Sequence, residues 1–265
     1  MIGSEELAKF IRLNSLEMCS NGKSSHIGSV LSCSDLLAVL YSRILKFNPN
    51  NPSCEKRDRF LMSKGHAGAG FYATLSKVGF IEENILKTHY QNGSFLSGHV
   101  CHKIFPGVEF STGSLGHALP VSVGIALALK LKKSMSRVFC LMSDGELDEG
   151  SNWEAFLSGS HYKLNNLIAI IDRNRLQSIE DTETTLSLEP LREKFLSFNW
   201  SVDVIDGHNH NDISSALSYF DKNKPKVIIA NTTKGKGVSF MENNVLWHYK
   251  SPSKEDLIKA KGELS

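Results

Sequence analysis

The second half of the chain alternates short apolar segments with stretches of helical periodicity. Valine and isoleucine are concentrated in apolar segments at 137–143, 166–172, 200–206 and 226–232. Strands of this composition, separated by helices of about 10–15 residues, are typical of a parallel sheet that is buried on both faces. The pattern therefore predicts an α/β fold, a parallel sheet covered by helices on both faces.

The first half of the chain has a different pattern. Apolar residues from Leu7 to Leu16 mark one helical face, and a second helix is expected over 34–47, with Ser34 and Asp35 as its N-terminal cap. A short strand at 59–63 leads into a glycine-rich helix entry, whereas residues 90–115 lack periodicity and exceed an ordinary connector, which indicates function or disorder. Without a repeat or linker, residues 1–265 are expected to form a single domain.

Composition narrows the classes of partner. The chain has 30 Lys and Arg against 28 Asp and Glu, a formal net charge of +2, so no strong field draws nucleic acid or a membrane surface. Its five cysteines are odd in number and contain no CxxC pair, which favours reduced thiols in a cytoplasmic protein over a disulfide framework or a zinc cluster. Apolar runs such as 167–171 are far too short to span a bilayer.

The most informative residues follow the strands, because ligands of open parallel sheets bind beyond the carboxyl ends of the strands. Asp144 and Asn174 follow consecutive strands and are 30 positions apart, so both should reach the same sheet edge. Their carboxylate and amide oxygens suit Mg²⁺ or Ca²⁺, and Gly145 lets the backbone approach a phosphate at a helix N-terminus. This predicts a metal-bridged diphosphate site; the alternative is a plain strand-to-helix turn with Asp144 as its cap.

The Asp-Gly pair, the intervening helix and the downstream Asn resemble the thiamine diphosphate-binding motif, usually GDG followed after nearly thirty residues by Asn. The resemblance extends along the chain through SSHIG, SKGH, SGHV, TGSLGH, WSVDVIDGHN and the stretch from TTKGKG to VLWH, and covers nearly its full length in family order. The whole chain resembles the N-terminal, cofactor-binding half of transketolase, and specifically the separate N-terminal subunit of transketolases that are split into two polypeptides.

For the cofactor, the resemblance implies thiamine diphosphate held through Mg²⁺ or Ca²⁺. Asp144, Asn174 and the backbone carbonyl of Leu176 would ligate the metal, and Gly145 would pack against the diphosphate. Further cofactor contacts are implied for His66, for Gly113, Ser114 and Leu115 around the aminopyrimidine, and for Lys234.

For the substrate, the resemblance implies that His26, His66 and His99 line a channel for sugars, hydrogen-bond their hydroxyls and assist proton transfer. His248 would make a further cofactor or substrate contact. Glu149 and Glu154 match glutamates that lie at the subunit interface between paired cofactors, although both also fit the acidic first turn of a helix.

The sequence departs from the family pattern at Ser143, where the motif commonly has Gly, at Ile27, where Pro is often seen, and at His117, where Gln is frequent. None of these removes a proposed metal ligand. In the family, the glutamate that activates the aminopyrimidine and most arginines that grip the sugar phosphate belong to the other half. The chain is therefore expected to be inactive alone and to require a C-terminal-half partner, in an α₂β₂ assembly.

The expected activity is transfer of a two-carbon ketol unit from a ketose (phosphate) to an aldose (phosphate). A deoxyxylulose-phosphate-synthase-like ligase and a 2-oxo acid decarboxylating subunit keep the same cofactor and stay open, although the channel histidines favour sugars. A non-catalytic regulatory or scaffold subunit with a degenerate site is the alternative from another class.

Overall fold

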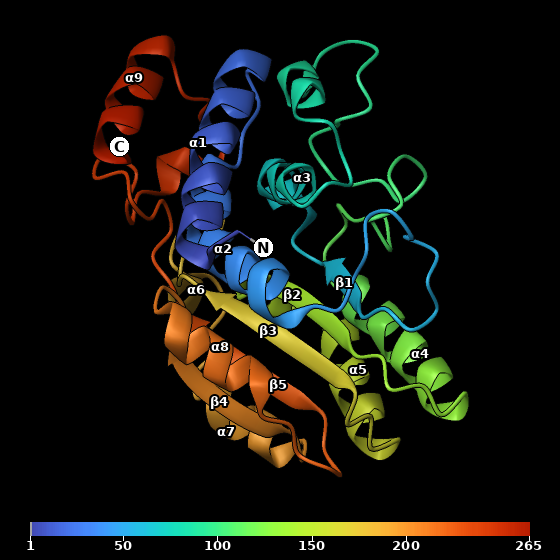
Figure 1. Ribbon diagram of the computed structural model, residues 1–265. Coiled ribbons are helices and arrows are strands. Elements are labelled where there is room, and N and C mark those ends of the chain that lie inside the picture. The colour runs from blue at the N-terminus through green and yellow to red at the C-terminus, as the bar shows by residue number, and fades with distance from the viewer. Residues whose placement is uncertain (1) are drawn as a thin grey trace.

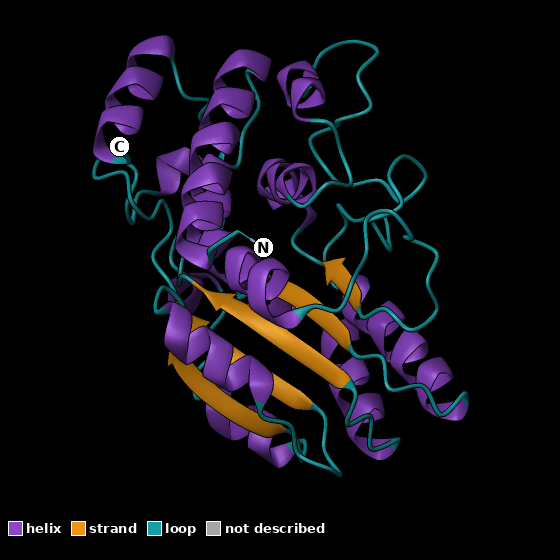
Figure 2. Cartoon of the chain, in the orientation of Figure 1, coloured by secondary structure: helices purple, strands orange, loops and turns teal. Residues whose placement is uncertain are grey.

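The computed structural model describes residues 2–265, and a five-stranded parallel sheet forms its centre (Figure 2). The strand order is β1-β2-β3-β5-β4, and all neighbouring pairs are parallel. The strands are β1 (Arg59–Met62), β2 (Val138–Ser143), β3 (Leu167–Arg173), β4 (Ser201–Asp206) and β5 (Lys226–Asn231). Each lies within one or two residues of a segment predicted from the sequence, so the parallel α/β fold is confirmed.

Helices cover both faces of this sheet, as predicted (Figure 1). One apolar core joins the sheet to helices near the N-terminus and to α8, and a second joins the opposite face to α4, α5 and α7. The first set comprises α1 (Ser4–Gly22), α2 (Ile27–Val39), α3 (Gly68–Lys77) and α8 (His210–Ser218). The second comprises α4 (Ala118–Leu131), α5 (Gly150–His161) and α7 (Leu191–Ser197), with the short α6 (Thr182–Thr185) nearby; α9 (Lys254–Glu263) packs on α1.

The second N-terminal helix differs from its prediction. It begins at Ile27 rather than near Ser34 and continues past Val39 as a π-helical turn, Leu40–Ile44. Ser34 and Asp35 are therefore interior residues, and the predicted cap is wrong. The carboxylate of Asp35 is satisfied instead by an ion pair with Arg12 of α1. A buried tertiary partner has replaced the local role that the sequence suggested.

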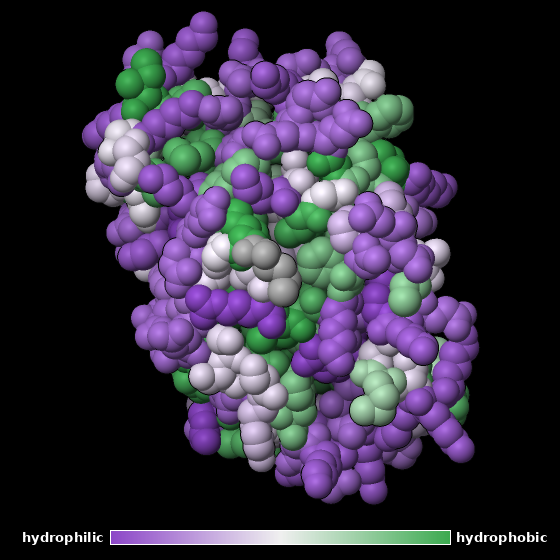
Figure 3. Space-filling model, viewed as in Figure 1, coloured by the Kyte–Doolittle hydropathy of each residue, from purple (hydrophilic) through white to green (hydrophobic). Residues whose placement is uncertain are grey.

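This same helix is the only described segment that is long and apolar enough to cross a membrane, at Ile27–Ile44. Of that window, 83% is buried inside the fold, where it packs against α1, α3 and α8 as a core helix. Figure 3 shows the face that carries these helices: hydrophilic side chains dominate its periphery, and apolar side chains show near its middle.

Short 3₁₀ turns, η2 (Gly65–Ala67), η3 (Glu83–Thr88), η4 (Gly145–Asp148) and η5 (Val245–His248), shape the loops around the strand ends. From 89 to 117 the described chain forms no helix or strand, so the predicted long irregular segment is confirmed. This segment returns to the carboxyl edge of the sheet, where the N–H of Thr112 donates to the carbonyl of Val100 and its hydroxyl to that of Met62.

Candidate active site

The carboxyl ends of β2 and β3 bring the two central predicted residues together. The strands are adjacent and parallel, with Ser143 opposite Asp172, so the residues that follow them share one edge of the sheet. Asp144 and Asn174 both line a cavity of ≈ 240 Å³, called the site cavity below. Its other lining residues come from the strand-end loops and the histidine-bearing segments: His26, Ser29, His66, His99, Gly113, Leu115, Ser143, Gly145, Leu176, Gln177, Ser178, Lys234, His248 and Tyr249.

Asp144 and Asn174, which line this cavity, each have an oxygen that can still bind a cation. Oδ1 of Asp144 accepts one hydrogen bond, from the N–H of Gly145 at 2.9 Å, and Oδ1 of Asn174 accepts one from the N–H of Leu176 at 3.1 Å. A carboxylate or amide oxygen can accept two, so each keeps a free lone pair. Burial, together with the charge of Asp172, raises the pKa of the Asp144 carboxyl, and a bound cation would offset that effect.

Protein cations already lie at two of the proposed ligands. The guanidinium of Arg173 lies 3.3 Å from Oδ2 of Asp144, and both side chains are buried. The ammonium group of Lys234 lies 2.9 Å from the carbonyl oxygen of Leu176 and 3.1 Å from that of Gln177. Among the residues that the structure describes, no cluster of three or more His, Cys, Asp or Glu side chains suits a metal. The proposed ligands are one carboxylate (Asp144), one amide (Asn174) and one backbone carbonyl (Leu176). Because all three donors are hard oxygens, they fit Mg²⁺ or Ca²⁺ better than a softer metal.

The four histidines predicted to contact substrate or cofactor form a cluster on the same cavity. The ring centroid of His26 lies 5.4 Å from that of His66, 5.9 Å from that of His99 and 4.9 Å from that of His248. His26 has a left-handed backbone with φ 76° at the start of α2, and its N–H donates to the carbonyl of His248 at 2.8 Å. A non-glycine residue in this conformation is strained, and such strain is concentrated at functional sites.

The environment favours neutral imidazoles in this cluster. Burial, followed by the neighbouring positive groups, lowers the pKa of His26 to about 4 and that of His248 to about 3. Burial also holds the pKa of His66 well below its ordinary value, and burial lowers that of His99. A neutral imidazole donates one hydrogen bond and accepts another, which matches the dual character of a sugar hydroxyl.

A buried ion pair lies beneath the cavity. The ammonium group of Lys64 contacts the carboxylate of Asp172, and both side chains are 0% exposed. Asp172 also accepts hydrogen bonds from the hydroxyls of Ser32, at 2.5 Å, and Thr232. The pair thus ties β1, β3, α2 and the loop after β5 to one point directly below the histidines. Both residues lie at the ends of predicted strands, 59–63 and 166–172, but no sequence pattern gives them a role.

The loop that carries Gly113 and Leu115 is held by a second buried carboxylate. Glu146 is fully buried and accepts hydrogen bonds from the Ser63 hydroxyl at 2.5 Å, from the Gly116 N–H at 2.9 Å and from the Ser143 N–H at 3.3 Å. Ser143 remains the last residue of β2, so the turn tolerates its side chain in place of the commoner glycine. Glu146 was not identified from the sequence because the acidic run that contains it is typical of a helix start.

The backbone beside Lys234 is fixed by a histidine from the loop after β4. Nε2 of His208 accepts the N–H of Thr233 at 2.8 Å, so its proton lies on Nδ1, which donates to Asp35 at 2.7 Å. His210 donates to the same carboxylate through Nε2, at 3.1 Å. This network connects α2 with the segment that presents Lys234 to the cavity.

Three predicted residues do not line the site cavity. Ser114 is an exposed residue between the two that do. Glu149 is the N-cap of α5, where it packs against Gly116, and Glu154 is exposed on the same helix. Cofactor contacts from these three residues stay predictions, and for the two glutamates they would have to involve a second chain.

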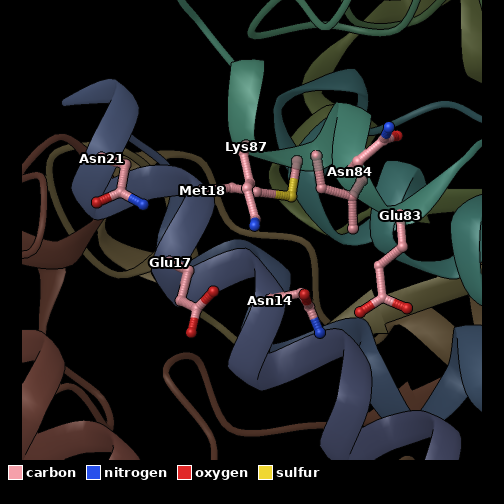
Figure 4. A pocket seen from close by; sticks show the side chains of 8 residues that line it. Asn14, Glu17, Met18, Asn21, Glu83, Asn84 and Lys87 are labelled. Carbon is pink, nitrogen blue, oxygen red and sulfur yellow. The ribbon is translucent and has the colours of Figure 1, made fainter.

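Other cavities differ in character. One of ≈ 200 Å³ adjoins the site and shares His26, His66 and His99 with it, and its remaining walls include serines, Tyr90 and His89. Another, of ≈ 270 Å³, lies between α1 and η3, where Asn14 and Glu17 face Glu83 and Lys87 (Figure 4). The pocket of Figure 4 contains none of the residues predicted to act in catalysis or binding, so the chemistry is assigned to the strand-end cavity.

Comparisons with known proteins agree with this geometry. Residues 4–264 match the family described as the transketolase, thiamine diphosphate binding domain. An apulose-4-phosphate transketolase subunit of Phocaeicola vulgatus is 44% identical over 252 residues, covering 94% of this chain and 89% of that protein. The 6-deoxy-6-sulfo-D-fructose transketolase subunit SqwG of a Clostridium species is 37% identical over 249 residues, covering 93% of this chain and 90% of that protein.

Among solved structures, transketolase from Campylobacter jejuni superposes with a TM-score of 0.93 at 33% identity. The match covers 100% of this chain but 43% of that one. Fold and site together define a thiamine diphosphate-binding α/β domain of the N-terminal type. The chain belongs to the transketolase family, and its resemblance to the N-terminal subunit of a split transketolase is confirmed.

Proposed function

We propose that the chain is the cofactor-binding subunit of a two-chain transketolase, a transferase that moves a two-carbon ketol unit from a ketose phosphate to an aldose phosphate. The single observation that carries this proposal is the convergence of Asp144, Asn174 and the four histidines on one cavity at the sheet edge. Both subunit relatives named above act, by their names, on sugar derivatives that carry an anionic group.

In this proposal, Asp144, Asn174 and the Leu176 carbonyl would hold Mg²⁺ or Ca²⁺, and the metal would neutralise charge on the diphosphate of thiamine diphosphate. The ammonium of Lys234 would release the Leu176 carbonyl to the metal and turn to the phosphate oxygens, and Gly145 would offer its backbone. Thiamine diphosphate, when bound, supplies the thiazolium carbon that cleaves and forms the carbon–carbon bond.

The histidines of the cluster act on the sugar. Neutral imidazoles of His26, His66, His99 and His248 exchange hydrogen bonds with sugar hydroxyls and relay protons between them and the carbonyl oxygen. A backbone hydrogen bond from the N–H of His26 to the carbonyl of His248 holds these two histidines next to each other. The Lys64–Asp172 pair below them fixes the floor of the cavity without presenting a free charge to the substrate.

Activity requires a C-terminal-half partner in this proposal, and the chain spans 43% of the Campylobacter enzyme. Self-association, giving an α₂β₂ assembly, has a candidate surface on α4. Gly124 and Ala128 are exposed on the face of this helix that the sheet leaves free, and Leu131 is 76% exposed one turn further on. A side chain at Gly124 would meet nothing within 4 Å, so this face of α4 is open to a second helix. Glu154 lies on the adjacent α5.

The interface is tested by Ala128→Glu, which places a charge on that face, with Lys132→Glu, at the C-cap of the same helix, as the matched control. We expect the first variant to lose dimers in analytical ultracentrifugation of the reconstituted complex and the second to keep them. Equal assembly of both variants would refute this surface.

The cofactor site is tested by calorimetry of Mg²⁺ and thiamine diphosphate binding to the chain reconstituted with its C-terminal-half partner. Asp144→Asn should weaken cofactor binding by about 10- to 100-fold, since metal-site substitutions have effects of at least this size. Asp212→Asn, an exposed acid in the first turn of α8, is the matched control and should change nothing. Chelation should abolish activity and added Mg²⁺ should restore it.

The same complex separates the alternatives. Two-carbon transfer between sugars supports the transketolase function, whereas release of CO₂ from a 2-oxo acid supports a decarboxylating or deoxyxylulose-phosphate-synthase-like subunit. Failure to bind the cofactor even in the complex would indicate a non-catalytic scaffold. The proposal includes a cytoplasmic location, which is supported by the five cysteines, all of which are free thiols.

A further inference from the structure

Tyr249 borders the site cavity next to two of its histidines. Its ring centroid lies 4.8 Å from that of His248 and 5.9 Å from that of His26, both in edge-to-face arrangement. The side chain is 64% exposed, so one side of the ring contacts the histidines while the other faces solvent at the mouth of the cavity. No pattern in the sequence marks this residue.

The position of this ring is fixed by the fold. On one side of Tyr249, the carbonyl of His248 accepts the N–H of His26 at 2.8 Å. On the other side, the ammonium of Lys250 lies 4.3 Å from the centroid of the Trp247 ring, and the hydroxyl of Ser251 donates to the carbonyl of Ser24 at 2.9 Å. The backbone is thus anchored before and after Tyr249, so the exposed ring has a defined place.

The chemistry of Tyr249 suits a sugar better than a diphosphate. Its hydroxyl makes no hydrogen bond to any residue in 2–265, so it can donate to and accept from a ligand. It contacts His248, which in turn contacts Lys234 at 3.0 Å, and Lys234 contacts the Leu176 carbonyl at 2.9 Å. Two side chains therefore separate Tyr249 from the metal end of the cavity.

The wall opposite the metal end consists of neutral and aromatic groups. His26 has two exposed neighbours, His99 and Tyr249, each with its ring centroid 5.9 Å away. A sugar held by the histidines would pass these side chains as it extends towards solvent. An aromatic ring there limits the bulk that can pass, and the phenol offers one directional hydrogen bond.

We propose that Tyr249 is a specificity-determining residue of this subunit, whose ring limits the size of the sugar beyond its reacting carbons and whose hydroxyl bonds a sugar hydroxyl. The inference rests on the proposed transketolase function and deepens it by assigning Tyr249 to the sugar rather than to the cofactor. Its consequence is a preference for compact ketoses over longer ones.

The experiment uses the complex reconstituted with the C-terminal-half chain, with Tyr249→Phe, Tyr249→Ala and the control Tyr219→Ala, an exposed tyrosine that lies outside the site cavity. Steady-state kinetics are measured with a five-carbon and a seven-carbon ketose phosphate. Binding of the same sugars and of thiamine diphosphate is measured by calorimetry, which needs no turnover.

Tyr249→Phe should raise the KM for the sugar about two- to tenfold, the loss expected for one hydrogen bond, with kcat and cofactor affinity unchanged. Tyr249→Ala should shift the ratio of kcat/KM by about tenfold or more towards the seven-carbon sugar, the scale on which pocket size discriminates substrates. Tyr219→Ala should match the wild type in both respects.

Two outcomes would overturn the assignment. The first is an unchanged ratio of kcat/KM for the two sugars in both Tyr249 variants. The second is weaker thiamine diphosphate binding with an unchanged KM for the sugar, which would assign Tyr249 to the cofactor. A wild-type complex that binds the sugars but transfers no two-carbon unit would refute the proposed function alone, and the ratio of sugar dissociation constants would then decide on Tyr249. A wild-type complex that binds neither sugar would refute both.

Discussion

The buried Lys64–Asp172 pair offers the sharpest test of how this site is supported. Lys64→Met keeps the length of the side chain and removes its charge, which leaves the Asp172 carboxylate 0% exposed with only the hydroxyls of Ser32 and Thr232 as partners. Burial alone would raise the pKa of Asp172, but the charge of Lys64 and these hydrogen bonds hold its pKa below the ordinary value. Lys64 is therefore what keeps this buried carboxylate ionised at low cost.

The magnitude follows from the burial. Removing one partner of a fully buried ion pair costs about 3–5 kcal/mol, because the other charge stays in the interior without compensation. For a chain of 265 residues, the average entropy of unfolding converts this loss to a decrease in Tm of about 5–9 °C. The same loss is a large part of the total stability of an ordinary domain, which is about 5–15 kcal/mol.

The assay is denaturant unfolding of the chain, followed by circular dichroism. Lys64→Met/Asp172→Asn should recover most of the loss, since it removes both charges. The amide offers its oxygen to one of the two hydroxyls and an N–H to the other, which can turn to accept it. The control is Lys261→Met, which breaks the Lys261–Glu17 pair, whose side chains are 40% and 43% exposed; it should cost less than about 1 kcal/mol. Equal losses for Lys64→Met and Lys261→Met, or a double variant no more stable than Lys64→Met, would refute the reasoning.

Two further predictions concern histidines. Burial lowers the pKa of His89 to about 4, below its unfolded value of about 6.5. Between these pH values the unfolded chain binds more protons than the folded chain. The free energy of unfolding should therefore fall by up to about 3 kcal/mol as the pH drops from about 6.5 to about 4. Denaturation curves recorded across this pH range should show that His89→Gln lacks this part of the pH dependence of stability. Parallel plots of stability against pH for the wild type and the variant would contradict the prediction. His208→Ala should weaken thiamine diphosphate binding about two- to tenfold by freeing Thr233, as one lost hydrogen bond predicts. Calorimetry should show no such change for His210→Ala, which also contacts Asp35 but leaves Thr233 held; equal effects would refute a positioning role.

Much of the candidate site could be predicted because its residues are placed by local sequence patterns and by the order of strands in the sheet. The strands have continuous apolar composition, and consecutive parallel strands of a β-helix-β unit are normally neighbours, so Asp144 and Asn174 had to reach one edge. The histidines and Lys234 were found through short motifs, and the structure places all of them on the same cavity. Tyr249 lies beside one of these motifs, but no rule of spacing distinguishes a rim tyrosine from a surface one.

The failed prediction at Asp35 shows the opposite situation. A Ser-Asp pair before an apolar stretch is a sound local signal for a helix cap, yet the residues before it are helical too. What fixes Asp35 is its contact with Arg12, 23 positions earlier, and with His208, 173 positions later. No local pattern contains that information.

The sequence by itself determined the class of fold, the edge of the sheet proposed to bind the cofactor and most of the side chains that line the site cavity there, because periodicity and strand order act over short stretches of chain. Tertiary structure alone decided which charges lie beneath the site, since Lys64 and Asp172 are 108 positions apart and meet only when β1 and β3 have joined the same sheet. It also decided that the pKa values of His26 and His248 lie below the ordinary value, because the pKa of an imidazole depends on the burial and the charges that packing creates around it.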